Sequence, residues 1–197
     1  MSINEKLKEM TDRAAKSSSQ ALSKLISDEV GVEVTNLEVA EVQKGLKDLG
    51  PEDMVVGVYV EITGDLNGSS LLVFPEKIAY DLCDLLVKRE LGTTQKLTDL
   101  DKSALKEVGN IICGSFSSVF SNTLNIKMIE HPPKLSFDML GAVTDQVIAE
   151  YAKKGGEALI IEVKFDFQRE KIEGYIALIF GVEEMEAIMG ALEKSEK

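Results

Sequence analysis

The sequence predicts an α+β fold, in which a pseudo-twofold internal duplication gives one antiparallel β-sheet with long helices packed on it. Two observations support this class. Helical apolar periodicity alternates with runs of β-branched residues, and the order helix, strand, hairpin, helix occurs twice in 197 residues. Pairing the hairpins of both halves in a single sheet removes two exposed edges and gives the helices a common surface.

The first half begins with a helical pattern and continues with extended runs. Two of these runs are joined by Gly64-Asp-Leu-Asn-Gly68, whose composition is typical of a hairpin turn. We predict a helix at residues 3–27, strands at Val30–Val42, Val55–Thr63 and Ser69–Phe74, and a helix from Pro75 to about Leu91.

After Gly92-Thr-Thr the same order begins again. The second half is longer because it inserts Gly141–Gly156. We predict a helix from about Thr98 to Leu124, an extended piece at Met128–Leu135, a helix near Thr144–Lys153, strands at Ala158–Phe167 and Lys171–Phe180, and a final helix at Val182–Glu193.

The two halves also align residue by residue. A shift of 98 residues places Leu7-Lys8-Glu9 on Leu105-Lys106-Glu107 and Ser23 on Ser121. Farther on, a shift of 106 residues places Leu71 on Ala177. We therefore predict a single domain built of two repeats, about residues 1–97 and 98–197, whose long first helices lie side by side.

Composition and charge narrow the function classes. The chain is 44% hydrophobic and 28% charged, which is ordinary for a globular protein with a sizeable core. Its 34 acidic and 22 basic residues give a net charge of −12, so attraction to nucleic acid or to an anionic membrane is disfavoured. With neither a secretory signal pattern nor an apolar stretch of spanning length, we expect a soluble, cytoplasmic chain.

Few residues suit metal or nucleophilic chemistry. Cys83 and Cys113 lie in apolar helical patterns without CxxC spacing, which predicts reduced, buried thiols. The single histidine, His131, stands beside Pro132 and Pro133, which favours an extended segment over a chemical role. No Walker loop, GxGxxG or HExxH sequence occurs, and we expect the chain to bind no metal or cofactor of its own.

One helical segment presents a compact polar strip. Ser103, Glu107 and Asn110 stand at i, i+4 and i+7, within an arc of about 60°, while apolar side chains point the other way. Solvation alone would select such residues on the wet face of a helix. However, a Gly109-Asn110 pair costs about 1–1.5 kcal/mol of helix propensity relative to alanines. The strip is therefore a candidate site.

These residues resemble a known family, the CheC-type phosphatases of bacterial and archaeal chemotaxis, which are related to CheX and FliY. The family motif is Asp or Ser, three residues, Glu, two residues, Asn, then twenty-two residues and Pro. Here Ser103, Glu107, Asn110 and Pro133 meet every spacing. The flanking sequence, the duplication and the chain length are also similar to CheC, so the resemblance covers essentially the whole chain.

The first repeat departs from this pattern. Glu5 and Glu9 suit the first two motif positions, but Asp12 replaces the amide and Thr35 stands at the position of the proline. An aspartate cannot donate the hydrogen bonds of a carboxamide, and its charge would approach an anionic phosphoryl group. We therefore expect one intact site, in the second repeat, and one degenerate site in the first.

The resemblance implies a protein aspartyl-phosphate phosphatase. Its substrate would be the phosphorylated response regulator CheY, which itself brings Mg²⁺ and a lysine to the phosphoryl oxygens. Asn110 would position the attacking water, because its carbonyl accepts from water while its NH₂ donates elsewhere. Glu107 would pair with the regulator's lysine, with Ser103 and Pro133 as supporting positions.

Other functions stay open. The chain could act mainly as an adaptor that binds phosphorylated regulator or the receptor deamidase CheD. A weaker alternative is a structural part of the flagellar or archaeal motor switch. Since a fused pseudo-dimer has less need to dimerise, we expect a monomer.

Overall fold

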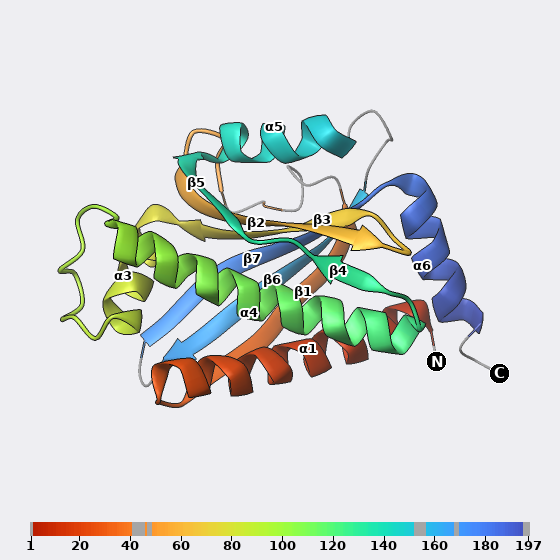
Figure 1. Cartoon of the computed structure of the whole chain (residues 1–197), viewed down its shortest axis with the longest axis horizontal. Coiled ribbons are helices and arrows are strands. Elements are labelled where there is room, and N and C mark those ends of the chain that lie inside the picture. The colour runs from red at the N-terminus through yellow and green to blue at the C-terminus, as the bar shows by residue number, and fades with distance from the viewer. Residues whose placement is uncertain (1, 41–45, 47–48, 152–156, 168–169, 195–197) are drawn as a thin grey trace.

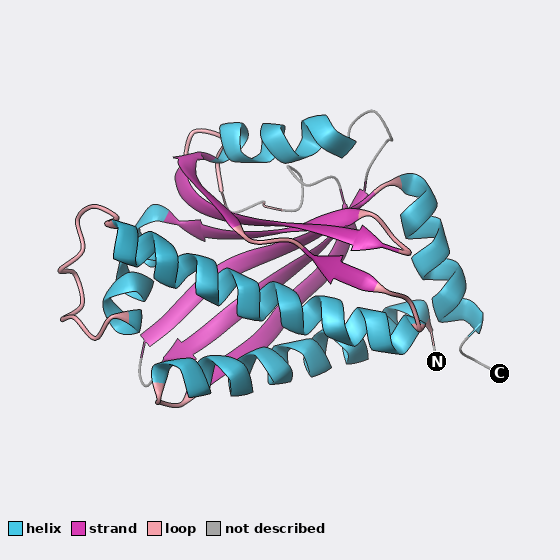
Figure 2. Cartoon of the chain, viewed as in Figure 1, coloured by secondary structure: helices cyan, strands magenta, loops and turns pink. Residues whose placement is uncertain are grey.

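The computed structural model describes residues 2–40, 46, 49–151, 157–167 and 170–194. Seven strands form one antiparallel sheet in the order β1-β6-β7-β3-β2-β4, and β5 pairs with β2 beside β4. Long helices cover the sheet, as Figures 1 and 2 show. The predicted α+β class is therefore confirmed.

The element bounds stay close to those predicted. In chain order they are α1 (Ile3–Ile26), β1 (Val30–Ala40), β2 (Met54–Gly64), β3 (Gly68–Pro75), α3 (Glu76–Leu86), α4 (Asp99–Leu124), β4 (Met128–Glu130), β5 (Lys134–Met139), α5 (Leu140–Tyr151), β6 (Glu157–Phe167), β7 (Glu170–Phe180) and α6 (Val182–Lys194). The predicted ends at Val42 and Lys153 lie outside the described residues.

Three predicted bounds are wrong. The extended piece predicted to end at Leu135 continues as β5 to Met139, which pairs with Met54 of β2. The helix predicted to reach Leu91 ends at Leu86, because Lys88 takes the left-handed conformation (φ 57°) and Arg89 N–H turns back to donate to the Asp84 carbonyl at 2.7 Å. The helix predicted from Thr144 begins at Leu140, whose N–H donates to the Asp53 carbonyl at 2.8 Å. The early end of α3 comes from a local turn, whereas the early start of α5 comes from a contact with Asp53, far away in the sequence.

The sheet is symmetric about its central strands, β3 and β7. Leu71 pairs directly with Ala177, the residue that the shift of 106 places on it, so a pseudo-twofold axis passes between them. Each half lends its first strands to the hairpin of the other half: β1 pairs with β6, and β4 and β5 pair with β2. The two halves of the chain are therefore intertwined in one sheet, which fits the predicted duplication. The division into repeats at residues 1–97 and 98–197 stays a prediction.

The long helices α1 and α4 lie side by side across the sheet, as predicted (Figure 1). They also end alike. Asp28 N–H donates to the Ser23 carbonyl at 3.2 Å, and Ile126 N–H donates to the Ser121 carbonyl at 3.0 Å. The shift of 98 relates these two pairs, so the helix ends follow the alignment that the sequence indicates.

Apolar side chains pack on both faces of the sheet. On one face, α1, α3, α4 and α6 cover the larger core, with Phe74, Phe116 and Phe165 among its buried side chains. On the other face, α5 packs over a smaller core through Val143 and Val147. Burial of this kind is the main stabilising contribution to such a fold.

Helix α4 packs directly against β2 at Gly109, which is buried. A Cβ atom placed there would lie 2.4 Å from Cγ1 of Val58, closer than carbon atoms can pack. The glycine that weakens the helix locally is therefore required by packing.

We expect Gly109→Ala to destabilise the protein by about 1–3 kcal/mol, because the added methyl group overpacks the contact with Val58. The control is Gly190→Ala on α6, where a Cβ would meet nothing within 4 Å; helix propensity there predicts a gain of about 0.5–1 kcal/mol. Urea unfolding measures both. Equal effects of the two substitutions would contradict the close packing of α4 on β2.

Candidate functional site

The predicted strip lies on the solvent side of α4. Ser103, Glu107 and Asn110 are all exposed, whereas Leu105 and Val108 on the opposite side are fully buried. Among the described residues, the carboxamide of Asn110 makes no hydrogen bond. It is therefore available to an external group, and its role stays a prediction.

The start of α4 is fixed by a buried carboxylate. Asp101 forms a capping box with Thr98, whose N–H and hydroxyl donate to Asp101 Oδ2 at 2.8 and 2.6 Å. Arg89 Nη1 donates to Asp101 Oδ1 at 2.6 Å. Burial opposes ionisation, but these hydrogen bonds outweigh it and lower the pKa of Asp101 below its ordinary value.

A second buried carboxylate, Asp84 on α3, organises the loop before α4. Thr94 donates through its hydroxyl to Asp84 Oδ1 at 2.6 Å, and Thr93 N–H donates to Oδ2 at 2.9 Å. Arg89 links the two carboxylates: its Nη1 donates to Asp101 and also to Thr94 Oγ1 at 2.9 Å, and the Thr94 hydroxyl in turn donates to Asp84. Sequence patterns do not predict this network as a whole; the only local signal of it is the Thr-x-x-Asp pattern at residues 98–101, which is typical of a capping box.

Pro133 lies in the break between β4 and β5, and it is half-buried. His131 N–H donates to the Glu61 carbonyl at 2.9 Å just before this break. The first half has an irregularity at the corresponding place, because the register of β1 on β6 skips Thr35 between Val34 and Asn36. Thr35 and Pro133 thus occupy related breaks in strand pairing.

Glu130 of β4 borders the strip one turn beyond Asn110. A Cβ on Gly114 would lie 3.2 Å from Glu130 Oε2, so the missing side chain leaves room for this carboxyl group. Burial raises the pKa of Glu130. Its Oε1 is buried without a hydrogen-bond partner among the described residues. Glu130 is not recognisable from the sequence, because only the fold brings β4 against α4.

The corresponding strip on α1 is more heavily charged. Glu5, Glu9 and Asp12 are exposed and line a shallow groove together with Lys8, Arg13 and Lys16. Glu5 is engaged in capping α1: Ser2 N–H donates to its Oε2 at 2.7 Å, and hydrogen bonds from Ser2 lower its pKa. At the start of α4 this capping role falls to Asp101, which leaves Ser103 outside the cap.

In the described part of the chain, neither the thiols nor the acidic side chains form a further reactive or metal-binding site. Cys83 and Cys113 are buried and unpaired, as predicted, and burial raises the pKa of each to about 12. Within the described ranges, no three His, Cys, Asp or Glu side chains are grouped to hold a metal ion. Nor is any described helix long and apolar enough to cross a membrane.

The intertwined sheet, the paired long helices and the exposed strip on α4 can be compared with those of known proteins. The model of the CheC-like family matches residues 100–136, the segment that runs from the start of α4 through the strip to Pro133. The predicted resemblance is therefore confirmed on the residues that suggested it.

Known proteins extend the similarity over the whole chain. The CheY-P phosphatase CheC of Bacillus subtilis is 23% identical over 191 residues, 94% of this chain and 91% of that protein. The crystal structure of Thermotoga maritima FliY has a TM-score of 0.76 at 20% identity and covers 98% of this chain and 97% of its own. A chain of the CheX-CheY-BeF3-Mg complex from Borrelia burgdorferi has a TM-score of 0.56 at 18% identity, covering 87% and 97%.

We expect Asp101→Asn to lower the free energy of unfolding by about 2 kcal/mol at neutral pH, because Arg89 loses its buried carboxylate. The folded-state pKa lies below the ordinary value of 3.8, so this stabilisation is complete well above 3.8 and is lost as the pH falls from that value through the lower folded-state pKa. The difference in stability from the native protein is therefore constant above about pH 5 and narrows as the pH falls from about 5 to about 2.

Urea unfolding across this pH range measures the effect. The matched control is Asp99→Asn, an exposed residue in the same helical turn, which should change stability by less than about 0.5 kcal/mol. A constant difference between Asp101→Asn and the native protein at every pH would contradict the lowered pKa.

Proposed function

We propose that this chain is a phosphatase for a response regulator that carries an aspartyl phosphate, CheY in chemotaxis. The Bacillus subtilis relative is named a CheY-P phosphatase, and the Borrelia burgdorferi complex joins CheX to CheY with BeF3 and Mg. The observation that carries the proposal is the free, exposed carboxamide of Asn110, in line with Glu107 and within the segment that matches the CheC-like family.

The chemistry requires a water molecule in line with the bond between phosphorus and the aspartyl oxygen. Mg²⁺ and a lysine, both expected in the regulator, neutralise the phosphoryl oxygens. Asn110 then accepts a hydrogen bond from the water through its Oδ1 and orients it for attack, while its NH₂ group donates to the regulator. A neutral amide suits this task, because it approaches the anionic phosphoryl group without charge repulsion.

Glu107 supplies the anchor. It lies three residues before Asn110 on the same exposed face, so its carboxylate and the amide can engage one partner surface together. Pairing with the regulator's lysine would orient α4 over the phosphorylated aspartate. Ser103, one turn earlier, would extend the contact, and Pro133 would shape the adjoining β4–β5 segment.

The first repeat lacks the amide. Glu9 of α1 keeps the anchoring carboxylate, but Asp12 is charged, and Arg13 and Lys16 stand where the second repeat has Ile111 and Gly114. We therefore assign turnover to the α4 strip and leave docking as the role of the α1 strip.

We expect Asn110→Ala to lower kcat for phosphate release by about 10²-fold or more while changing KM little, because the amide acts on the attacking water. The matched control is Asn122→Ala, an exposed asparagine on the same helix. Release of phosphate from purified phosphorylated regulator measures both. Native turnover by Asn110→Ala would show that this residue does not position the water.

Glu107→Ala should weaken association as well as turnover. A carboxylate paired with a lysine at an interface contributes about 1–3 kcal/mol, so we expect the Kd for regulator carrying a phosphoryl analogue to rise about 10-fold or more. Calorimetric titration gives the Kd. An unchanged Kd would remove the anchoring role from Glu107.

The substitution Asp12→Asn tests the degenerate site. If the α1 strip lacks only its amide, restoring it should raise phosphate release measurably above the native rate, even in the Asn110→Ala background. An unchanged rate in both backgrounds would assign α1 a structural or docking role.

A second candidate function is an adaptor that binds phosphorylated regulator, the deamidase CheD, or both. Two observations favour this candidate: the identity to the named phosphatase is only 23%, and the helices α1 and α4, which lie side by side, each carry an exposed polar strip. An adaptor carrying Asn110→Ala would still bind the phosphorylated regulator with native affinity. It would therefore lower the concentration of unbound phosphorylated regulator as much as the native protein does.

A further inference from the structure

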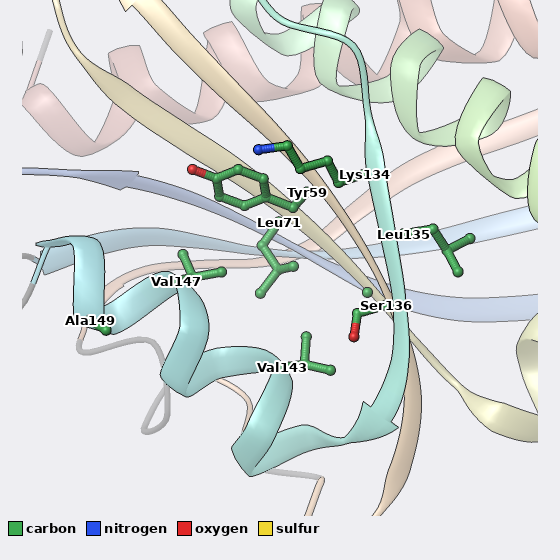
Figure 3. A pocket seen from close by; sticks show the side chains of 9 residues that line it. Tyr59, Leu71, Lys134, Leu135, Ser136, Val143, Val147 and Ala149 are labelled. Carbon is green, nitrogen blue, oxygen red and sulfur yellow. The ribbon is translucent and has the colours of Figure 1, made fainter.

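A cavity of about 460 Å³ lies on the face of the sheet opposite α4, between α5 and the β2–β5 pair. Figure 3 shows its lining side chains. This volume is in the range of small-molecule sites in proteins. The cavity is separate from the α4 strip, so a ligand can bind in it without occupying the proposed phosphatase site.

The inner part of the cavity is apolar. Val143 and Val147 project from α5 toward Leu71 on the sheet. The cavity borders β2 at Gly57, where Val143 takes the place of a side chain: a Cβ on this glycine would lie 2.6 Å from Val143 Cγ1. These groups offer a hydrocarbon chain a dry surface but no hydrogen-bonding side chain.

The outer part of the cavity is polar and cationic. Lys134 of β5 pairs across the strands with Tyr59 of β2, and Lys134 Nζ lies 5.7 Å from the centre of the Tyr59 ring. Figure 3 shows the ammonium and phenol groups directed to the same side. Among the described residues, no carboxylate forms an ion pair with Lys134, although the protein has a net charge of −12.

We propose that this cavity binds a small amphipathic anion, such as a medium-chain carboxylate. The chain would lie against Val143, Val147 and Leu71, and the anionic head would pair with the ammonium of Lys134. A cation would meet the positive charge of Lys134, and a strongly polar molecule would leave the apolar walls without a matching surface.

The placement of β2 makes the cavity distinct from the phosphatase strip. Side chains alternate along this strand, so Val58 faces Gly109 of α4 while Gly57 and Tyr59 face the cavity. Binding can therefore be measured without regulator present, and its failure would leave the phosphatase proposal untouched.

The test is titration of the full chain with octanoate below its micelle concentration, followed by methyl NMR. We expect saturable shifts of the Leu71, Val143 and Val147 methyl groups. Octylamine should give none of these shifts. Lys134→Met should weaken octanoate binding on the order of fivefold, whereas Lys134→Arg should retain it.

Two further variants locate the site. Ala149→Trp, at an exposed lining position, should block octanoate, and Lys127→Met, an exposed lysine outside the lining, should not change binding. Chemical shift changes confined to methyl groups outside the cavity would contradict the proposal that octanoate binds there. Equal binding of octanoate, octanol and octylamine, or an unchanged affinity in Lys134→Met, would overturn the preference for an anion.

Discussion

The contact between Gly109 and Val58 is the constraint on which the rest of the candidate site depends. It brings the backbone of α4 close to the centre of β2, and this fixes which residues of the helix are buried and which face solvent. The next residue along the helix, Asn110, is turned by about 100° and emerges on the exposed side. The buried carboxylate of Asp101, paired with the partly exposed Arg89, holds the start of the helix, so the strip is presented by a helix fixed at two points.

The two halves share one frame and differ in the groups displayed on it. Their long helices end with the same hydrogen bonds, and their outer strands break pairing at related positions. On the second half, Gly114 leaves space that the half-buried carboxyl group of Glu130 occupies. The first half has Lys16 and Val32 at these places. The predicted duplication would account for the shared scaffold, and the replacement of Asn by Asp at position 12 accounts for the missing amide in the α1 strip.

Much of the fold follows from sequence patterns that depend on near neighbours. Hairpin composition predicts the β2–β3 turn, and the shift of 106 relates Leu71 to Ala177 as equivalent residues; that these two residues pair is seen only in the structure. The strip was predictable because helical spacing alone puts its residues on one face. The network around Asp84 and the carboxyl group of Glu130 were not, because their partners come from other elements and only tertiary packing brings them together. Gly109 is a similar case. Its unfavourable helix propensity is evident from the sequence, but its close contact with Val58 is evident only from the structure.

The central claim is that the α4 strip catalyses hydrolysis and does not merely capture phosphorylated regulator. The most direct measurement counts phosphate released from an excess of phosphorylated CheY by a small, known amount of this protein. Catalysis predicts many phosphates released per protein molecule, and a rate that falls to the regulator's own rate in Asn110→Ala. Release or loss of signal that stops at one regulator per protein molecule would contradict the account.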